Sequence, residues 1–248
     1  MEFDSYGTDI VPEQPKQPNF VENEELVNDI VDKYKNNFPI VYGVNRSGST
    51  LLRNIMNTIF HGNIAIQCAE YVETDRKIVG VYRDFRDAAV SRHRVNQNGQ
   101  RNTFDTEERK QTFSWDSVKG DAHEIKNQIK NNLNQFKENY STEQLLLVKY
   151  ENFHEDFDYL CDKLEPFFDI VIKKELREFL KITWNKERVR RDYTKPLKEI
   201  IQSDPETDFH GGHIYKGIHG TWKELMGEGG ERLTEYFAED LEEWGYEL

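Results

Sequence analysis

Two hydrophobic patterns alternate along this chain: short apolar runs, and stripes with the spacing of a helix. The apolar runs predict strands and lie at residues 40–44, 64–66, 77–82 and 145–148. The stripes predict helices and lie at residues 24–34, 51–59, 88–91, 125–136, 157–167 and 233–244. Strands that alternate with helices in this way indicate a central parallel sheet covered on both faces. We therefore predict an α/β fold of three layers.

Other stretches lack this periodicity. Residues 1–25 hold three prolines and many acids, so we expect a loosely structured lead-in before a single domain at residues 26–248. The polar stretch at residues 92–120 is rich in turn residues, and we expect an irregular lid or binding loop there. We also expect a loop at the glycine- and histidine-rich residues 209–220. The run at residues 145–148 is wholly apolar and predicts a fully buried strand.

Polar residues follow three of the predicted strands, at positions 45–46, 83–84 and 150–151. In a parallel α/β sheet, ligands bind outside the carboxyl ends of the strands. The three pairs should therefore meet at one edge of the sheet and form one site.

The stretch GVNRSGSTLL at residues 43–52 links the first strand to the next helix. A glycine-rich turn that opens into a helix is typical of an anion site, because the helix dipole and the first N–H groups point at the turn. Gly43 and Gly48 have the spacing of an ATP- or GTP-binding P-loop, but Ser49 stands where its lysine belongs. The nearest cation is Arg46. We expect a site for a different phosphate ester; the alternative is an ordinary strand-to-helix turn.

The charge balance limits the classes of ligand. The chain has 33 Lys and Arg against 46 Asp and Glu, a net charge of −13, which argues against nucleic acid and anionic membranes as partners. An anionic ligand therefore needs locally concentrated cations. Cys68 and Cys161 lack the spacing of a disulfide framework or a metal site, so we expect both to be small buried side chains. The sequence shows no long apolar run or signal-peptide pattern, and we expect a cytoplasmic protein.

Three separated segments share the pattern of a single family. They are the loop at residues 43–52, YRDFRDAAVS at residues 82–91 and YKGIHGTWK at residues 215–223, with a Tyr-Glu pair at 150–151 after a strand. In this order they resemble the phosphosulfate loop, the 3′-phosphate segment and the late R-K-G-x-x-G-x-W-K segment of sulfotransferases that use 3′-phosphoadenosine 5′-phosphosulfate (PAPS). The resemblance covers residues 38–246. The loop is most similar to those of carbohydrate, tyrosylprotein and bacterial sulfotransferases.

This resemblance implies a P-loop nucleotide-kinase-like fold and PAPS as the cofactor, with adenosine 3′,5′-bisphosphate as product and no metal required. The cofactor-binding residues that it implies are Arg46, Ser47, Gly48, Ser49, Thr50, Leu51, Arg83, Ser91, Tyr150, Tyr215, Lys216 and Gly217. Residues 47–50 would cradle the 5′-phosphate. Arg83 and Ser91 would hold the 3′-phosphate, and Tyr150 would contact the adenine.

Two positions depart from the family pattern. Tyr215 replaces an arginine, which alters one 3′-phosphate contact, and Leu51 stands where many cytosolic members carry an adenine-stacking tryptophan. For Arg83, a surface salt bridge to Asp84 or Asp87 is the alternative to a ligand role. We favour the ligand role because Arg83 sits at a strand end.

The implied reaction moves a sulfuryl group in line to a hydroxyl or amine of a small-molecule, carbohydrate or peptide acceptor. Arg46 would stabilise the charge that develops on the leaving oxygen. The basic run at residues 186–198 is either a surface that steers an acidic acceptor or closes over PAPS, or a solvated face.

A general base should lie near the loop, between the first two motifs. The candidates are His61, Glu70, Glu73 and Asp75. Glu70 resembles the glutamate in the C-G-E segment of tyrosylprotein sulfotransferases, so we place it first as the catalytic base, with His61 second. A solvated surface carboxylate is the alternative for Glu70. His93 would line the acceptor side or the surface.

Two other functions stay open at this stage. One is a P-loop kinase for a small molecule, although Ser49 in place of the lysine counts against it. The other is an inactive scaffold that binds the nucleotide without catalysis, for which the altered Tyr215 leaves room.

Overall fold

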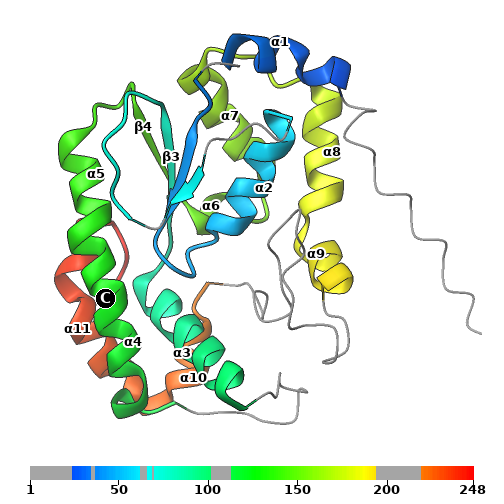
Figure 1. The fold of residues 1–248 in the computed structure, drawn as a ribbon. Helices are drawn as coiled ribbons and strands as arrows, with labels where there is room; N and C mark the ends of the chain where they lie inside the picture. Colours follow the sequence, from blue (N-terminus) through cyan, green and yellow to red (C-terminus); the bar gives the residue numbers. More distant parts are fainter. Residues whose placement is uncertain (1–23, 35–36, 62–65, 69, 102–112, 194–218) are drawn as a thin grey trace, which may run out of the picture.

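The sheet at the centre of the molecule is all parallel. A computed structural model describes the 248-residue chain except for residues 1–23, 35–36, 62–65, 69, 102–112 and 194–218. The four strands are β1 (Ile40–Gly43), β2 (Ile66–Cys68), β3 (Ile78–Tyr82) and β4 (Leu145–Lys149). They lie in the order β2-β1-β3-β4 (Figure 1). Gly43 pairs with Val81, and Val81 pairs with Val148, so the strands end together at one edge.

One face of the sheet is covered by α1 (Glu24–Tyr34), α2 (Ser49–Ile59), α7 (Phe157–Phe168), α8 (Lys174–Trp184) and α9 (Lys186–Tyr193). The short helix α6 (Tyr150–Phe153) leads from β4 into this layer. Val41 and Val79 point into this core, where they pack with buried residues such as Ile55 and Leu160.

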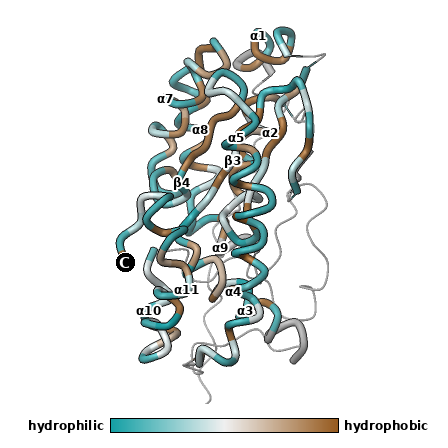
Figure 2. The backbone as a smooth tube through the Cα atoms, turned by 90° about the vertical axis from the view of Figure 1, so that its left-hand side faces the viewer, coloured by the Kyte–Doolittle hydropathy of each residue, from teal (hydrophilic) through white to brown (hydrophobic). Residues whose placement is uncertain are grey.

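The opposite face is covered by α3 (Phe85–Arg101), α4 (Trp115–Gln128), the π-helical turn η2 (Ile129–Leu133), α5 (Asn134–Asn139), α10 (Thr221–Met226), the 3₁₀ turn η3 (Gly227–Gly229) and α11 (Gly230–Glu243). Tyr42 and Ile78 belong to this second core, so neighbouring strand residues alternate between the two cores. Figure 2 shows hydrophobic stretches inside the molecule and hydrophilic stretches along its outer helices. The predicted three-layer α/β fold is confirmed.

The prediction of an irregular region at residues 92–120 is wrong at both ends. Helix α3 continues to Arg101, and α4 begins at Trp115 after a capping box on Ser114; residues 102–112 lie outside the described part. The second half of α3 buries polar side chains. His93 is only 4% exposed and its Nδ1 lies 2.9 Å from Oδ2 of Asp121. Because a buried polar side chain with a polar partner replaces apolar residues here, the sequence shows no helical stripe.

Three further predictions change in detail. The described second strand is Ile66–Cys68, so it extends beyond the predicted residues 64–66, of which 64 and 65 lie outside the described part. β4 is not fully buried, since Leu146 and Leu147 are partly exposed on an edge strand. The first part of the basic run at residues 186–198 forms α9, and Val189 packs into the first core.

Several expectations fall on residues outside the described part, namely most of the lead-in at residues 1–25, most of the loop at residues 209–220 and the end of the basic run. The single domain at residues 26–248 stays a prediction. Cys161 is fully buried, and burial raises the pKa of its thiol to about 12, as a structural cysteine requires. None of the helices in the described part combines the length and apolar character needed to cross a membrane.

Candidate functional site

The turn between β1 and α2 depends on two glycines. Gly48 is the residue before α2 and has a φ of 93°, in the left-handed region. A Cβ on Gly48 would lie 2.3 Å from Cδ2 of Tyr150, and a Cβ on Gly43 would lie 2.6 Å from Cβ of Ser49. Both positions therefore exclude larger residues. The first turn of α2 holds no acidic residue, so the positive end of the helix dipole faces the turn.

Arg46 occupies a strained position in this turn. Its φ is 68°, a left-handed conformation that costs an arginine about 1 kcal/mol or more. Its Nε donates a hydrogen bond to Oγ of Ser91 on α3 across 3.2 Å. The turn and the 3′-phosphate segment are thus joined by their two predicted ligand residues.

Positive charge accumulates around Arg46. Burial and the neighbouring guanidinium groups of Arg94 and Arg83 lower the pKa of Arg46 to about 9. Arg94 is only 7% exposed, and Nη1 of Arg83 lies 3.5 Å from the carbonyl oxygen of Arg46. These arginines concentrate positive charge locally in a chain whose net charge is −13.

Arg83 connects the end of β3 with the end of β4. Its guanidinium lies 5.1 Å from the ring centre of Tyr150, and Nη2 lies 3.3 Å from Oδ2 of Asp87. The salt bridge considered from the sequence is therefore present. Arg83 is nevertheless only 9% exposed. It lies beside the turn rather than on the outer surface.

Buried hydrogen bonds fix the same edge of the sheet. The backbone N–H of Asp84 donates to Oε1 of Glu151 across 2.9 Å, and Arg86 pairs with Asp84 across 2.8 Å. The structure thus brings together the three strand ends that the sequence assigned to one site.

The segment before α10 also reaches this edge. The N–H groups of Gly220 and Trp222 donate to the carboxylate of Asp87 across 2.8 and 2.9 Å. Nδ1 of His219 lies 3.6 Å from Asp87 and 3.7 Å from Glu151. Tyr215, Lys216 and Gly217 lie outside the described part, but the residues that follow them are anchored beside Arg83.

The remaining loop residues have mixed surroundings. Ser47 is fully buried. The carbonyl of Thr50 accepts a hydrogen bond from Asn54 across 2.8 Å. Leu51 is partly buried and packs against the first core. Ser49 is the first residue of α2.

The two candidates for the general base lie at different ends of the structure. Glu70 is exposed and follows β2, on the edge of the sheet that holds the turn. His61 follows the last turn of α2, a helix of 11 residues, so about 16 Å of helix separates it from the turn. Glu73 and Asp75 are exposed beyond Glu70. His93 is buried, edge-on to Phe113, so the expectation that it lies at the surface is wrong.

Sequence reasoning missed two side chains of this site, Arg94 and His219. Arg94 lies three residues after Ser91 and therefore on the same side of α3; a helix prediction beyond residue 91 would have found it. His219 carried no signal, because its partners lie in the turn after β3, in α3 and in α6.

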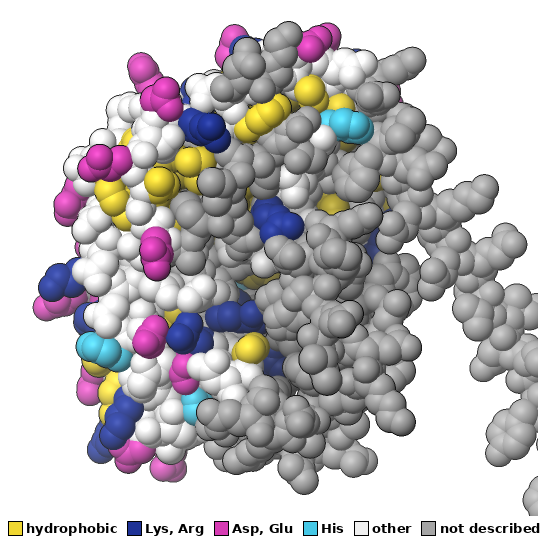
Figure 3. All heavy atoms as spheres, viewed as in Figure 1, with side chains coloured by type: hydrophobic (Ala, Val, Ile, Leu, Met, Phe, Trp, Pro, Cys, Tyr) yellow, Lys and Arg dark blue, Asp and Glu magenta, His cyan; other side chains and the backbone are white. Residues whose placement is uncertain are grey.

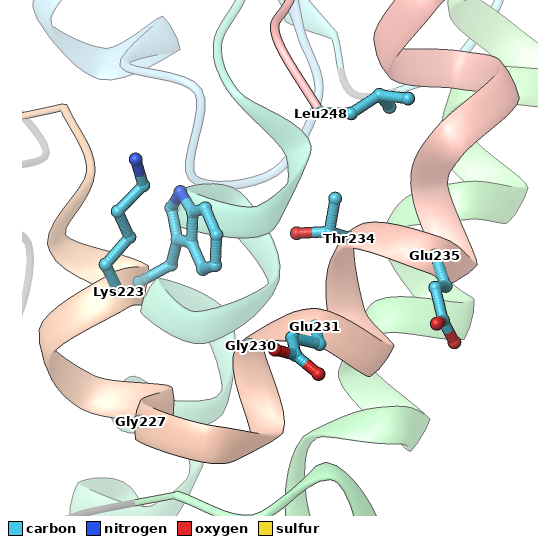
Figure 4. Close-up of a pocket in the computed structure, with 8 residues that line it drawn as sticks. Lys223, Gly227, Gly230, Glu231, Thr234, Glu235 and Leu248 are labelled. Carbon is cyan, nitrogen blue, oxygen red and sulfur yellow. The ribbon is translucent and has the colours of Figure 1, made fainter.

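The described residues offer one group that could hold a metal ion, Asp87, Glu151 and His219, whose ligand atoms lie within 4.8 Å of one another. These atoms already bond to each other and to backbone N–H groups, which accounts for the cluster. A separate open pocket of about 450 Å³ lies between α10 and α11, lined by residues such as Lys223, Thr234 and Leu248 (Figure 4). None of its described lining residues belongs to the turn or to the strand ends. Figure 3 shows Lys and Arg side chains near the centre of the molecular face that is viewed in Figure 1.

The described residues form an α/β fold of the P-loop type, in which a cluster of arginines lies at the turn where a P-loop carries its lysine. A family model described as "Sulfotransferase domain" matches residues 61–245. The chain therefore belongs to the sulfotransferase family, as the three sequence segments indicate. The match begins after the turn at residues 43–52, so the role of that turn rests on its geometry.

Solved structures show the same fold. Mouse sulfotransferase SULT7A1 complexed with PAP has a TM-score of 0.55 and 15% identity, with 88% of each chain covered. Retinol dehydratase in a complex with retinol and PAP has a TM-score of 0.54 and 14% identity, with 88% of this chain and 86% of that chain covered. No curated protein sequence matched the chain significantly.

Proposed function

We propose that this protein transfers the sulfuryl group of PAPS to a hydroxyl or amine acceptor. The observation that carries the proposal is the environment of Arg46. Its Nε donates to Oγ of Ser91 across 3.2 Å, and Nη1 of Arg83 lies 3.5 Å from its carbonyl oxygen. Burial and the neighbouring arginines, Arg94 first, also lower its pKa. A site that concentrates positive charge in this way favours a ligand with several negative charges.

Two anion pockets suit the two ends of the nucleotide. The turn at residues 43–48 and the start of α2 would hold the 5′-phosphosulfate. Arg83 and Ser91, with Lys216 from the late segment, would hold the 3′-phosphate, since an arginine can bond two phosphate oxygens at once. Tyr150, which lies against Gly48 and Arg83, would contact the adenine. The two structural neighbours were both crystallised with PAP, which supports this cofactor.

The proposed step is an in-line displacement. The acceptor oxygen or nitrogen forms a bond to sulfur, the bond from sulfur to the bridging phosphate oxygen breaks, and adenosine 3′,5′-bisphosphate leaves. Arg46 stabilises the negative charge on that bridging oxygen. The acceptor proton passes to the carboxylate of Glu70, which is exposed at the correct edge of the sheet. None of these residue roles demands a metal ion.

The acceptor is proposed only as a class, a small molecule, carbohydrate or peptide. One structural neighbour was solved with retinol, a small alcohol, which supports a small-molecule acceptor.

Nucleotide choice tests the cofactor. We expect adenosine 3′,5′-bisphosphate to raise the melting temperature in EDTA, and AMP, which lacks the 3′-phosphate, to raise it much less. ATP with Mg²⁺ serves as the comparison for a kinase. Stabilisation only by ATP with Mg²⁺ would overturn the proposal. Equal stabilisation by AMP and by adenosine 3′,5′-bisphosphate would show that the protein does not recognise the 3′-phosphate.

A further inference from the structure

The segment after β2 has no regular secondary structure, yet several side chains hold it in place. The N–H of Tyr71 donates to Oδ1 of Asn132 across 3.2 Å. The hydroxyl of Tyr140 donates to the carbonyl of Val72 and accepts from the N–H of Thr74, both across 2.8 Å. An exposed irregular segment normally bonds to water instead. Here three of its backbone groups bond to side chains of one helical unit, which consists of α4, η2, α5 and the capping residue Tyr140.

The same helical unit also holds the turn beside Arg46. The N–H of Asn45 donates to Oε1 of Gln128 across 2.8 Å. Gln128 ends α4 and Asn132 lies four residues later, in the π-helical turn η2. Residues four apart lie on the same face of a helix, about 6 Å from one another. The two amides therefore hold the segments that follow the two neighbouring strands β1 and β2.

The π-helical turn η2 directly follows Gln128 and contains Asn132. Such turns are rare, cost hydrogen-bond geometry and occur often at functional sites. Ile129 and Leu133 are fully buried, and Phe136 packs against Tyr42 of β1 and against Tyr71, with ring centres 4.5 and 5.0 Å apart. The helical unit is thus fixed to the sheet and to the segment after β2 at once.

We propose that Gln128, Asn132 and Tyr140 are positioning residues that set the distance between the donor turn and the acceptor-side segment. Gln128 bonds beside Arg46, and Asn132 bonds beside Glu70. Because the catalytic rate depends steeply on a displacement of about 1 Å, a rigid connection between these two segments keeps the base beside the sulfuryl group. This inference rests on the proposed function and adds the residues that hold the turn of Arg46 and the segment of Glu70 at a fixed distance.

The kinetic test compares four single variants with the wild type: Asn132→Ala, Tyr140→Phe, Gln128→Ala and the control Asn139→Ala. Asn139 is an exposed amide of α5 that bonds only within its own helix, to the carbonyl of Gln135. With labelled PAPS and an acceptor that the wild type sulfates, we expect Asn132→Ala and Tyr140→Phe to lower kcat about 10- to 100-fold. Their affinity for adenosine 3′,5′-bisphosphate should stay within about twofold, whereas Gln128→Ala should weaken it.

A second measurement does not need activity. Amide hydrogen exchange should show slow exchange at Tyr71 and Thr74 in the wild type and in Asn139→Ala. Tyr140→Phe should lose protection at Thr74, and Asn132→Ala at Tyr71, while the turn at residues 43–52 keeps its exchange rates. Fast exchange at both amides in the wild type would overturn the inference, and so would unchanged kcat in both variants.

These outcomes separate the inference from the proposed function. If the wild type transfers no sulfuryl group, the proposed function fails, whereas the exchange pattern still decides whether the connection exists. If the wild type is active and the variants lose nucleotide affinity and kcat equally, the positioning role is contradicted while the proposed function stands.

Discussion

Nε of Arg46 donates a hydrogen bond to Oγ of Ser91 across 3.2 Å and thereby joins the turn after β1 to helix α3. The two residues belong to the two segments that the sequence assigns to opposite ends of one nucleotide. Under the proposed function, this contact places the residue at the sulfuryl end beside one that holds the 3′-phosphate. Arg46 is therefore the residue whose replacement should separate function from stability most clearly.

Arg46→Gly should abolish activity without loss of stability. Glycine adopts a φ of 68° without strain, so we expect the free energy of unfolding to stay the same or to rise by about 1 kcal/mol. Turnover should fall by about 100-fold or more, because the charge on the leaving oxygen loses its partner. Denaturant melts and kcat measure the two effects. Arg232→Ala, on the exposed side of α11, is the control.

Gly48→Ala should damage both the turn and the adenine site. The added methyl group would overlap the ring of Tyr150 at 2.3 Å, and the φ of 93° disfavours alanine. We expect a loss of about 1–3 kcal/mol in the free energy of unfolding and a loss of nucleotide binding. Gly120→Ala is the matched control: a Cβ there meets nothing within 4 Å, so inside α4 it should add about 1 kcal/mol. Wild-type binding by Gly48→Ala would contradict the role of this contact.

The general base can be identified by two substitutions. Glu70→Gln should lower kcat by about 100-fold while nucleotide affinity stays unchanged. His61→Asn should have wild-type kinetics, because His61 lies at the far end of α2, and asparagine tolerates its φ of 51°. Glu73→Gln controls for the loss of a nearby exposed carboxylate. Full activity of Glu70→Gln, or a large loss in His61→Asn, would reverse this assignment.

The contact between His219 and Glu151 should make stability depend on pH. The contact between Nδ1 of His219 and the carboxylate of Glu151 raises the pKa of His219 against the effect of burial. The stabilisation from this contact is complete below the unfolded value of about 6.5 and is lost as pH rises through the folded value. Burial raises the pKa of Glu151, but His219 and the N–H of Asp84 outweigh burial and lower this pKa below 4.5. The stabilisation that Glu151 provides is therefore lost as pH falls through its folded pKa.

His219→Asn tests that dependence. The wild type should exceed the variant in free energy of unfolding between about pH 5 and 6.5, and the difference should shrink towards pH 9. Because His219 is half exposed, the difference should be less than about 1 kcal/mol. A difference that is equal at pH 6 and pH 9 would show that protonation of His219 plays no part.

The sequence predicts the sheet and its edge well, because apolar runs and strand-end polar residues are local signals. Arg46, Arg83 and Tyr150 meet as expected, since parallel strands must end on the same side. The second half of α3 could not be predicted, because buried polar side chains such as His93, which contacts Asp121, leave no apolar stripe.

Long-range contacts explain the other differences. The protonation environment of His219 arises from three carboxylates on three separate elements. The hydrogen bonds from Gln128 and Asn132 arise from a π-helical turn, for which periodicity gives no sign. Such contacts depend on how the layers pack, which a single sequence does not reveal.

Transfer of labelled sulfate tests the central claim most directly. Purified wild-type protein and Arg46→Gly are incubated in EDTA with ³⁵S-labelled PAPS and a panel of 2-naphthol, a tyrosine peptide and chitotriose. We predict that the wild type moves label to at least one acceptor and releases adenosine 3′,5′-bisphosphate in equal amount, and that Arg46→Gly does not. Nucleotide binding by the wild type without transfer to any acceptor, or undiminished transfer by Arg46→Gly, would contradict it.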